Sequence, residues 1–385
     1  MSKKKIISAI DAGTTKVCAL IAEVDENGKL RVAGIGCVPS RGMHKGMITD
    51  IDEAKESIRS AIKSAEQSSG YRIDSAYVGV TGHHITGHIN KGIVALTRSD
   101  HLVRPDDLRR VLQVGQSIKV ASDQKILHLI PRQYMIDGQD GVLNPVGMHG
   151  FQLDAETYII TAGVAAVQDL VKCIRGVGVG VDVEDLVFNG LASAEACLTE
   201  DDKQMGTILA DIGGGVTNIS IFKDGSVWHT AVIPVAGYQL TKDISIGLGL
   251  PFDVAEEMKK KYGTVIPRND ENADNDAIAQ NGHNISYKGL RDIIVARMDE
   301  LLRLIALELP NDEQKAIAPG GLVLTGGSSN LVGIDEFGKE ILKMPVRIGT
   351  PQNVYGDDRL NAPAFATALG LLLWGMKPSV KSGQK

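Results

Sequence analysis

Two aspartates in distant parts of the chain each end a short apolar segment and begin a turn rich in glycine. The two segments are Ile10-Asp11-Ala12-Gly13-Thr14-Thr15-Lys16 and Ala210-Asp211-Ile212-Gly213-Gly214-Gly215-Val216-Thr217-Asn218. Backbone N–H groups in such a turn form a concave site for anions, because glycine lets the main chain approach an oxygen closely. The threonine hydroxyls add further donors. Two such turns in one chain predict a clamp that holds the phosphates of a nucleotide from both sides.

The two aspartates of this predicted clamp also suit a metal ion. Magnesium keeps several waters and is anchored by one or two carboxylates together with substrate phosphates. We therefore expect Asp11 and Asp211 to hold Mg²⁺ through water. The alternative for either turn alone is an ordinary β-hairpin with Asp-Gly turn chemistry.

Length and composition narrow the class of protein. A chain of 385 residues is longer than one hydrophobic core usually serves, so two or more domains are expected. The net charge of −6 argues against nucleic-acid binding, which requires a concentrated basic surface. No apolar run approaches the roughly 20 residues of a membrane helix. Cys18, Cys37, Cys173 and Cys197 form no Cys-x-x-Cys pair, which predicts buried thiols rather than a disulfide or zinc framework.

The order of predicted elements indicates two similar α/β halves. Strands are expected at 6–10, 17–24 and 30–38, followed by a helix over 52–67 and a strand over 76–80. The strand, glycine turn and hairpin recur from residue 207 onward, which indicates an internal duplication. Between 81 and 162 the pattern changes to short alternating strands with one helix, typical of an inserted subdomain. Residues 267–286 are polar and predict a loop, and 289–309 predict an amphipathic helix.

Two further segments are candidates for the rest of a nucleotide pocket. Gly326, Gly327 and Ser328 follow a buried strand, and their turn would let backbone lie against a base or ribose. Glu256 and Lys259 stand three apart on a helix that begins near residue 253, so both could reach ribose and adenine. They could equally be a surface ion pair beside a capping box. Small residues in 191–198 and 363–374 would let two helices cross closely as a hinge, or belong to ordinary core helices.

Taken in order, these segments resemble the actin/Hsp70/sugar-kinase superfamily and, within it, the FtsA family of bacterial cell-division proteins. The likeness covers nearly the whole chain. It is sharpest in four segments, Pro39-Ser40-Arg41-Gly42-Met43, His128 to Tyr134, Asn144 to Gly150 and Gly190 to Ala194. The resemblance implies an α/β, actin-like (ribonuclease H-like duplicated) fold. Its two halves would surround a nucleotide cleft, with an inserted subdomain called 1C.

The resemblance also implies a division into subdomains. Subdomain 1A would comprise 1–80 and 163–182, interrupted by subdomain 1C at 81–162. Subdomain 2A would comprise 183–241 and 315–349, interrupted by subdomain 2B at 242–314. A connecting helix in 350–378 would return the chain to 1A, leaving a tail at 379–385.

The family's properties supply expectations for function. They imply ATP or ADP with Mg²⁺ in the cleft, self-association into filaments, and a link between the FtsZ ring and the cytoplasmic membrane during septum formation. Later division proteins would bind through 1C, and the C-terminal tail of FtsZ through 2B. Arg297 and Glu300, expected to be exposed on the helix over 289–309, are candidates for that surface, although both could simply lie on a solvated helix face.

Two departures from the family pattern affect these expectations. Family members normally end in a linker and an amphipathic membrane helix, whereas this chain stops at 378–385 without an apolar face. The chain is therefore expected to be truncated or to attach to the membrane elsewhere. Asn189 stands where related ATPases carry a polar residue that orients the attacking water, and an amide is a poor base. We expect nucleotide binding with weak or no hydrolysis.

Two other functions stay open at this point. One is a pilus-assembly actin-like adaptor, which also carries a 1C-type insertion. The other is a small-molecule kinase of the same superfamily, which would need a catalytic carboxylate and an acceptor pocket beside the γ-phosphate.

Overall fold

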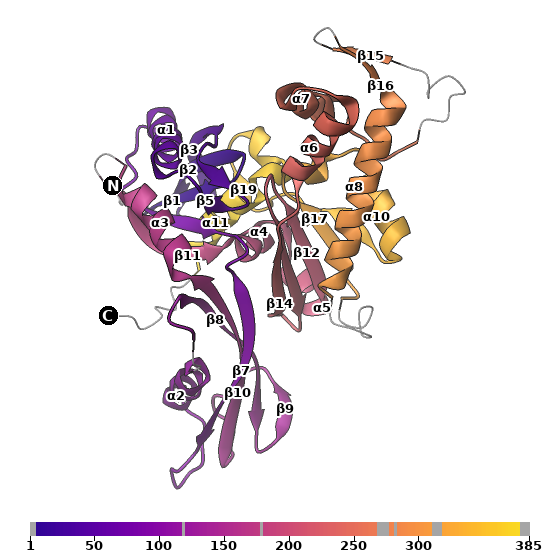
Figure 1. The fold of residues 1–385 in the computed structure, drawn as a ribbon. Coiled ribbons are helices and arrows are strands. Elements are labelled where there is room, and N and C mark those ends of the chain that lie inside the picture. The colour runs from indigo at the N-terminus through magenta and orange to yellow at the C-terminus, as the bar shows by residue number, and fades with distance from the viewer. Residues whose placement is uncertain are drawn as a thin grey trace.

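The computed structural model describes residues 5–117, 120–177, 180–267, 277–280, 283–309 and 318–377. The expected tail at 379–385 lies outside these ranges. Figure 1 shows two α/β halves side by side and a third, narrower unit that projects away from them. Among the described residues, no helix is long and apolar enough to cross a membrane.

The first half is built on a six-stranded sheet in the order β11-β6-β1-β2-β3-β19. Its strands are β1 (Lys5–Ala12), β2 (Lys16–Val24), β3 (Leu30–Pro39), β6 (Ser75–Val80), β11 (Asp182–Phe188) and β19 (Val354–Tyr355). The strands β1 to β3 are antiparallel, and β6 joins β1 in parallel. Helices α1 (Ile51–Ser69) and α3 (Val164–Arg175) pack on this sheet.

Local chemistry explains the bounds of α1. The Asp50 carboxylate accepts hydrogen bonds from the backbone N–H groups of Asp52 and Glu53, which satisfies donors that the helix leaves free. Gly70 ends the helix in the left-handed conformation. The buried positions recur at helical spacing, so α1 presents one apolar face to the sheet.

The second half repeats this plan. Its sheet has the order β14-β13-β12-β17-β18, and it begins with an antiparallel meander that β17 then joins in parallel. The strands are β12 (Thr207–Ile212), β13 (Thr217–Lys223), β14 (Ser226–Ile233), β17 (Leu322–Thr325) and β18 (Val346–Ile348). The helices are α5 (Glu200–Met205), α6 (Gly237–Leu248), α7 (Phe252–Tyr262), α8 (Tyr287–Leu307) and α10 (Ile334–Leu342). The expected duplication is therefore present.

Two short helices join the halves, α4 (Asn189–Cys197) and α11 (Ala366–Trp374). The 3-10 turns η3 (Asp358–Asn361) and η4 (Pro363–Phe365) lead into α11. The two helices cross so closely that a Cβ atom on Gly370 would collide with the carbonyl oxygen of Ala192. The small residues of these segments thus permit the crossing that the sequence predicts.

The inserted unit is a four-stranded antiparallel sheet in the order β7-β10-β8-β9 with one helix. Its elements are β7 (Thr86–Ala95), α2 (Pro105–Gln116), β8 (Gln124–Ile136), β9 (Gln139–Val142) and β10 (Gln152–Gly163). Hydrogen bonds connect it to the second half, among them one between the hydroxyls of Tyr158 and Thr230 at 3.1 Å. Thr230 N donates to the Tyr158 hydroxyl at 2.7 Å, and the Ser226 hydroxyl donates to Pro131 O at 2.7 Å.

The structure corrects the expected loop at 267–286. Within it, β15 (Ala277–Gln280) and β16 (His283–Ser286) form an antiparallel hairpin, and Ile285 is buried in the second half. The polar run at 268–276, on which the prediction rested, lies outside the described residues.

The expectation of four separate thiols is wrong for one pair. Cys18 and Cys37 are disulfide-bonded, because they stand directly opposite each other on β2 and β3 with their Cα atoms 4.3 Å apart. Cys173 and Cys197 are buried free thiols, as predicted. Spacing along the chain does not reveal which residues an antiparallel register places side by side.

Candidate functional site

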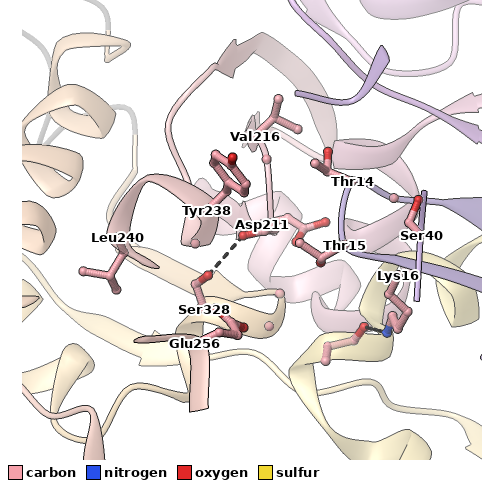
Figure 2. Close-up of a pocket in the computed structure, with 18 of the residues that line it drawn as sticks. Thr14, Thr15, Lys16, Ser40, Asp211, Val216, Tyr238, Leu240, Glu256 and Ser328 are labelled. Atoms are coloured by element: carbon pink, nitrogen blue, oxygen red, sulfur yellow. Dashed lines mark hydrogen bonds between the residues drawn. The ribbon is translucent and has the colours of Figure 1, made fainter. Parts of the chain in front are cut away.

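The two aspartate turns face each other across one cavity of about 960 Å³ between the halves. Figure 2 shows Thr14 and Thr15 of the first turn around the same space as Asp211 and Val216 of the second. The predicted residues of the turns that line the cavity are Asp11, Gly13, Thr14, Thr15, Lys16, Asp211, Gly213, Gly214, Gly215 and Asn218. Thr217 is not among them, because its side chain is fully buried and its hydroxyl donates to Val235 O at 2.8 Å.

The two turns approach each other as closely as glycine allows. A Cβ atom on Gly214 would collide with Thr15, and one on Gly215 would collide with Thr14. Gly214 and Gly215 are therefore needed in the second turn, because any larger residue there would collide with Thr15 or Thr14 of the first turn.

Asp211 is held by the two helices that join the halves. Its Oδ2 atom accepts hydrogen bonds from the Ser193 hydroxyl on α4 at 2.6 Å and from the Thr367 hydroxyl on α11 at 2.8 Å. Burial raises the pKa of Asp211, and the two hydroxyls and Lys16 partly offset this effect. The second turn is thus hydrogen-bonded directly to the junction between the halves.

Asp11 lies in the same buried environment. Burial raises its pKa to about 6, while Lys16 lowers the pKa and the carboxylate of Asp211 raises it further. Two buried carboxylates that disfavour each other's charge form a site that a cation would stabilise. Their oxygens suit Mg²⁺.

Lys16 extends from the first turn toward α11. Its Nζ donates to Ala364 O at 2.6 Å and lies 4.0 Å from the centre of the Phe365 ring. Burial lowers the pKa of Lys16, although Asp11 and Asp211 oppose this shift. The ammonium group therefore stands at the cavity wall beside both carboxylates.

Glu256 and Lys259 form an ion pair on α7 at 2.6 Å and also line the cavity. Thr241 lies between them, because its hydroxyl donates to Glu256 and accepts from Lys259 Nζ at 2.8 Å. Glu256 and Lys259 are therefore an ion pair, as the alternative interpretation expects. The pair faces the cavity, however, and not a solvated surface.

The cavity that Glu256 and Lys259 line is also lined by the turn Gly326, Gly327 and Ser328. They lie at and before η2 (Gly327–Asn330), directly after β17. The Ser328 hydroxyl donates to Gly213 O at 3.0 Å, the contact drawn in Figure 2, and so joins this turn to the second aspartate turn.

Asn189 is the first residue of α4, is 5% exposed and lines the cavity. Its Oδ1 atom has no hydrogen-bond partner within the part of the chain that the structure describes. It lies against Gly79, where a side chain would leave it no room. A buried acceptor without a partner is costly, so this atom suits a bound water.

Several lining residues were not predicted. The Thr81 hydroxyl pairs with Asn218 Oδ1 at the cavity wall. Arg41 and His44 line the opening, within or beside the Pro39-Ser40-Arg41-Gly42-Met43 segment, so their position could have been suspected. No sequence pattern points to Tyr238. It lines the cavity because the first turn of α6 lies against it.

The predicted partner residues lie apart from the cavity lining. Arg297 is not freely exposed: its side chain is 23% accessible and its Nε lies 2.5 Å from the Asp243 carboxylate on α6. The same guanidinium contacts Glu300, whose side chain is 53% accessible. The expectation of exposure is therefore correct for Glu300 and wrong for Arg297.

Solved structures show which fold the chain has. The PilM-PilN type IV pilus biogenesis complex matches with a TM-score of 0.67 at 18% identity, over 97% of this chain and 99% of that one. MreB5 of Spiroplasma citri bound to ADP matches with a TM-score of 0.54 at 15% identity, over 94% of both chains. At these identities the likeness concerns the fold alone. The chain therefore has an actin-like fold with two halves around a cleft.

Sequence relatives define the family. The chain is 41% identical over 378 residues to the cell division protein FtsA of Pseudomonas aeruginosa, covering 97% of this chain and 90% of that one. It is 33% identical over 384 residues to that of Escherichia coli, with coverage of 97% and 90%. The model for cell division protein FtsA matches residues 208–370, and that for the SHS2 domain inserted in FtsA matches 82–161. The chain belongs to the FtsA family of cell division proteins.

Proposed function

We propose that the cleft binds ATP or ADP with Mg²⁺ and that the nucleotide sets the shape of a filament subunit in cell division. One observation carries the proposal: two glycine turns from opposite halves meet across a single cavity, each beginning at a buried aspartate. The cavity of about 960 Å³ is at the upper end of the size of small-molecule sites.

Within this proposal, each wall has a separate role. Backbone N–H groups of residues 14–15 and 214–215, with Lys16 and Asn218, hold the phosphates, whereas the N–H groups of Gly13 and Gly213 close the turns by donating to Lys16 O and Val216 O. Asp11 and Asp211 hold Mg²⁺ through water. The pair on α7, Glu256 and Lys259, binds the ribose and adenine. The turn formed by Gly326, Gly327 and Ser328 supports the base.

We propose that hydrolysis is weak or absent. The unpaired Oδ1 atom of Asn189 can accept a hydrogen bond from a water and so orient it. An amide does not take up a proton near neutral pH, and general-base catalysis needs a group that does. Asn189 would therefore position water without activating it.

Thermal unfolding with ATP and Mg²⁺ tests the clamp. Bound nucleotide should raise the melting temperature, because a ligand that binds only the folded state stabilises it. Asp211→Asn keeps the size of the side chain but removes the charge, and it should abolish most of the shift. Asp201→Asn, an exposed position on α5, should keep it. An unchanged shift in Asp211→Asn would show that the clamp is assigned wrongly.

We further propose the adaptor role that FtsA-family membership suggests. The protein would polymerise, link the FtsZ ring to the cytoplasmic face of the membrane at the division site, and bind later division proteins through the inserted unit. The subdomains would follow the bounds expected from the sequence. Membrane attachment through a C-terminal amphipathic helix belongs to this proposal.

The surface for the FtsZ C-terminal tail would include Glu300 and the Arg297–Asp243 pair on α8 and α6. Arg297→Met removes the charge and leaves Asp243 without its partner, so peptide affinity should fall about tenfold. Arg303→Met is a matched control, because Arg303 lies on the same helix but pairs with Asp299. Titration of a labelled FtsZ tail peptide measures both. Equal affinity in the two variants would place the tail elsewhere.

A further inference from the structure

An aromatic contact spans the opening of the cavity between the two halves. The His44 ring of the first half meets the Tyr238 ring of the second half edge to face, with the ring centres 5.7 Å apart. Both residues line the cavity. No hydrogen bond or ion pair is needed for this contact, since the ring edge of one residue is attracted to the ring face of the other.

On the first half, His44 belongs to a small hairpin that its own turn holds in shape. The hairpin consists of β4 (Met43–His44) and β5 (Met47–Ile48), with Lys45 and Gly46 between them at φ values of 47° and 76°. Two positive φ angles are typical of a tight two-residue turn. Gly46 N donates to the Thr14 hydroxyl at 2.9 Å, so the hairpin is joined to the first aspartate turn.

On the second half, Tyr238 is joined to the other aspartate turn. Its backbone N–H donates to Gly214 O at 2.7 Å, and its ring centre lies 5.0 Å from that of Phe252 on α7. Thr14 and Gly214 thus each anchor one partner of the aromatic contact. A change in the separation of the two turns would therefore act on the two elements that carry the rings.

We propose that His44 and Tyr238 form a latch that holds the halves together over the phosphate end of the cleft and slows nucleotide exchange. The inference rests on the proposed function, because it takes a nucleoside di- or triphosphate as the ligand. The two residues are positioning residues: they act by holding the aspartate turns at the distance that the ligand requires.

Stopped-flow displacement of a fluorescent ATP analogue, with Mg²⁺ present, tests the latch on the full chain. His44→Ala and Tyr238→Ala should each speed dissociation about two- to tenfold, the range that an aromatic pair supplies. The double variant should dissociate no faster than the faster single variant, because both changes break one contact. Tyr238→Phe keeps the ring and should keep the slow rate. His149→Ala, an exposed histidine of the inserted unit, should have no effect.

The outcomes separate the latch from the clamp. If the unaltered chain binds no nucleotide, both proposals are overturned. If it binds but the alanine variants release the analogue at the original rate, only the latch is overturned. Effects that multiply in the double variant would also overturn it, since they would show two independent contacts. A fast rate in Tyr238→Phe would place the effect in the hydroxyl instead of the ring.

Discussion

The two aspartate turns share a sequence pattern but are supported by different parts of the molecule. Asp211 accepts hydrogen bonds from Ser193 and Thr367, one on each helix that joins the halves. The first turn is supported by the β4–β5 hairpin through Thr14 and by the segment before α11 through Lys16. The two copies of the motif are thus held in different places. The turn at Asp211 is held at the junction of the halves, and the turn at Asp11 is held by the hairpin at the cavity opening.

This difference gives the proposed nucleotide and cation different effects at the two turns. A cation bound to Asp211 would compete with the hydroxyls of Ser193 and Thr367 at the crossing of α4 and α11. A ligand on the first turn would instead act on the β4–β5 hairpin. Changes at the junction should therefore affect the stability of the whole chain, whereas changes at the first turn should affect it less.

The largest effect is expected where the joining helices cross. Gly370→Ala would place a Cβ atom against the Ala192 carbonyl and should lower the free energy of unfolding by about 3 kcal/mol. Helix propensity alone would predict the opposite sign, a gain of about 1 kcal/mol. Gly327→Ala is the control for stability, because the nearest atom to its Cβ would be 3.9 Å away. Urea denaturation measures both, and a stabilised Gly370→Ala variant would contradict a close crossing.

The second prediction concerns pH at the start of α4. Burial, with a smaller effect of Lys377, lowers the pKa of His128 to about 4, and its Nε2 accepts a hydrogen bond from Phe188 N at 3.0 Å. The unfolded chain, with a pKa near 6.5, binds the proton more readily. Stability is therefore complete above about pH 6.5 and falls as the pH drops toward 4, by about 3 kcal/mol in total.

Denaturation at pH 7 and at pH 4.5 measures this loss. His128→Gln cannot take up the proton, so it should lose less stability between the two values. An identical loss in the variant and in the unaltered chain would assign the pH dependence to other groups.

The smallest effects compare the two turns directly. Ser193→Ala removes a donor to a buried carboxylate and should cost about 2 kcal/mol, because hydrogen bonds to charged groups are the stronger ones. Thr14→Val removes the acceptor for Gly46 N and should cost about 1 kcal/mol. Both are measured without nucleotide. A larger cost at Thr14 would reverse the comparison.

The sequence was sufficient to predict the duplicated halves and their two aspartate turns. It was insufficient to predict the side-chain contacts between segments that are distant along the chain. The turns at Asp11 and Asp211 were predictable because a glycine turn after a buried strand has local chemistry. Thr217 shows the limit: residues alternate between the faces of a strand, and its hydroxyl meets Val235 instead of the cavity. The sequence shows that side chains in this strand alternate between two faces, but it does not show which of the two faces lines the cavity.

Contacts between distant segments were beyond local patterns for the same reason. The Cys18–Cys37 pair depends on strand register, and the partial burial of Arg297 depends on Asp243 of another helix. His44 and Tyr238 meet only because the halves fold toward each other. The likeness to a family carried the order of elements, whereas these side-chain partners follow from packing.

The inserted sheet has a mechanical consequence. The insert lies between β6 and α3 of the first half in the sequence, yet hydrogen bonds of Tyr158 and Pro131 join it to the second half. Figure 1 shows it extending well beyond both halves, and β10 alone spans 12 residues, roughly 40 Å of strand. Gln152 lies six residues before Tyr158, roughly 20 Å along the strand, so a rotation of about 5° at Tyr158 would move that end by roughly 2 Å. The length of the insert beyond its contacts with the second half therefore converts a small rotation into a larger displacement at its far end.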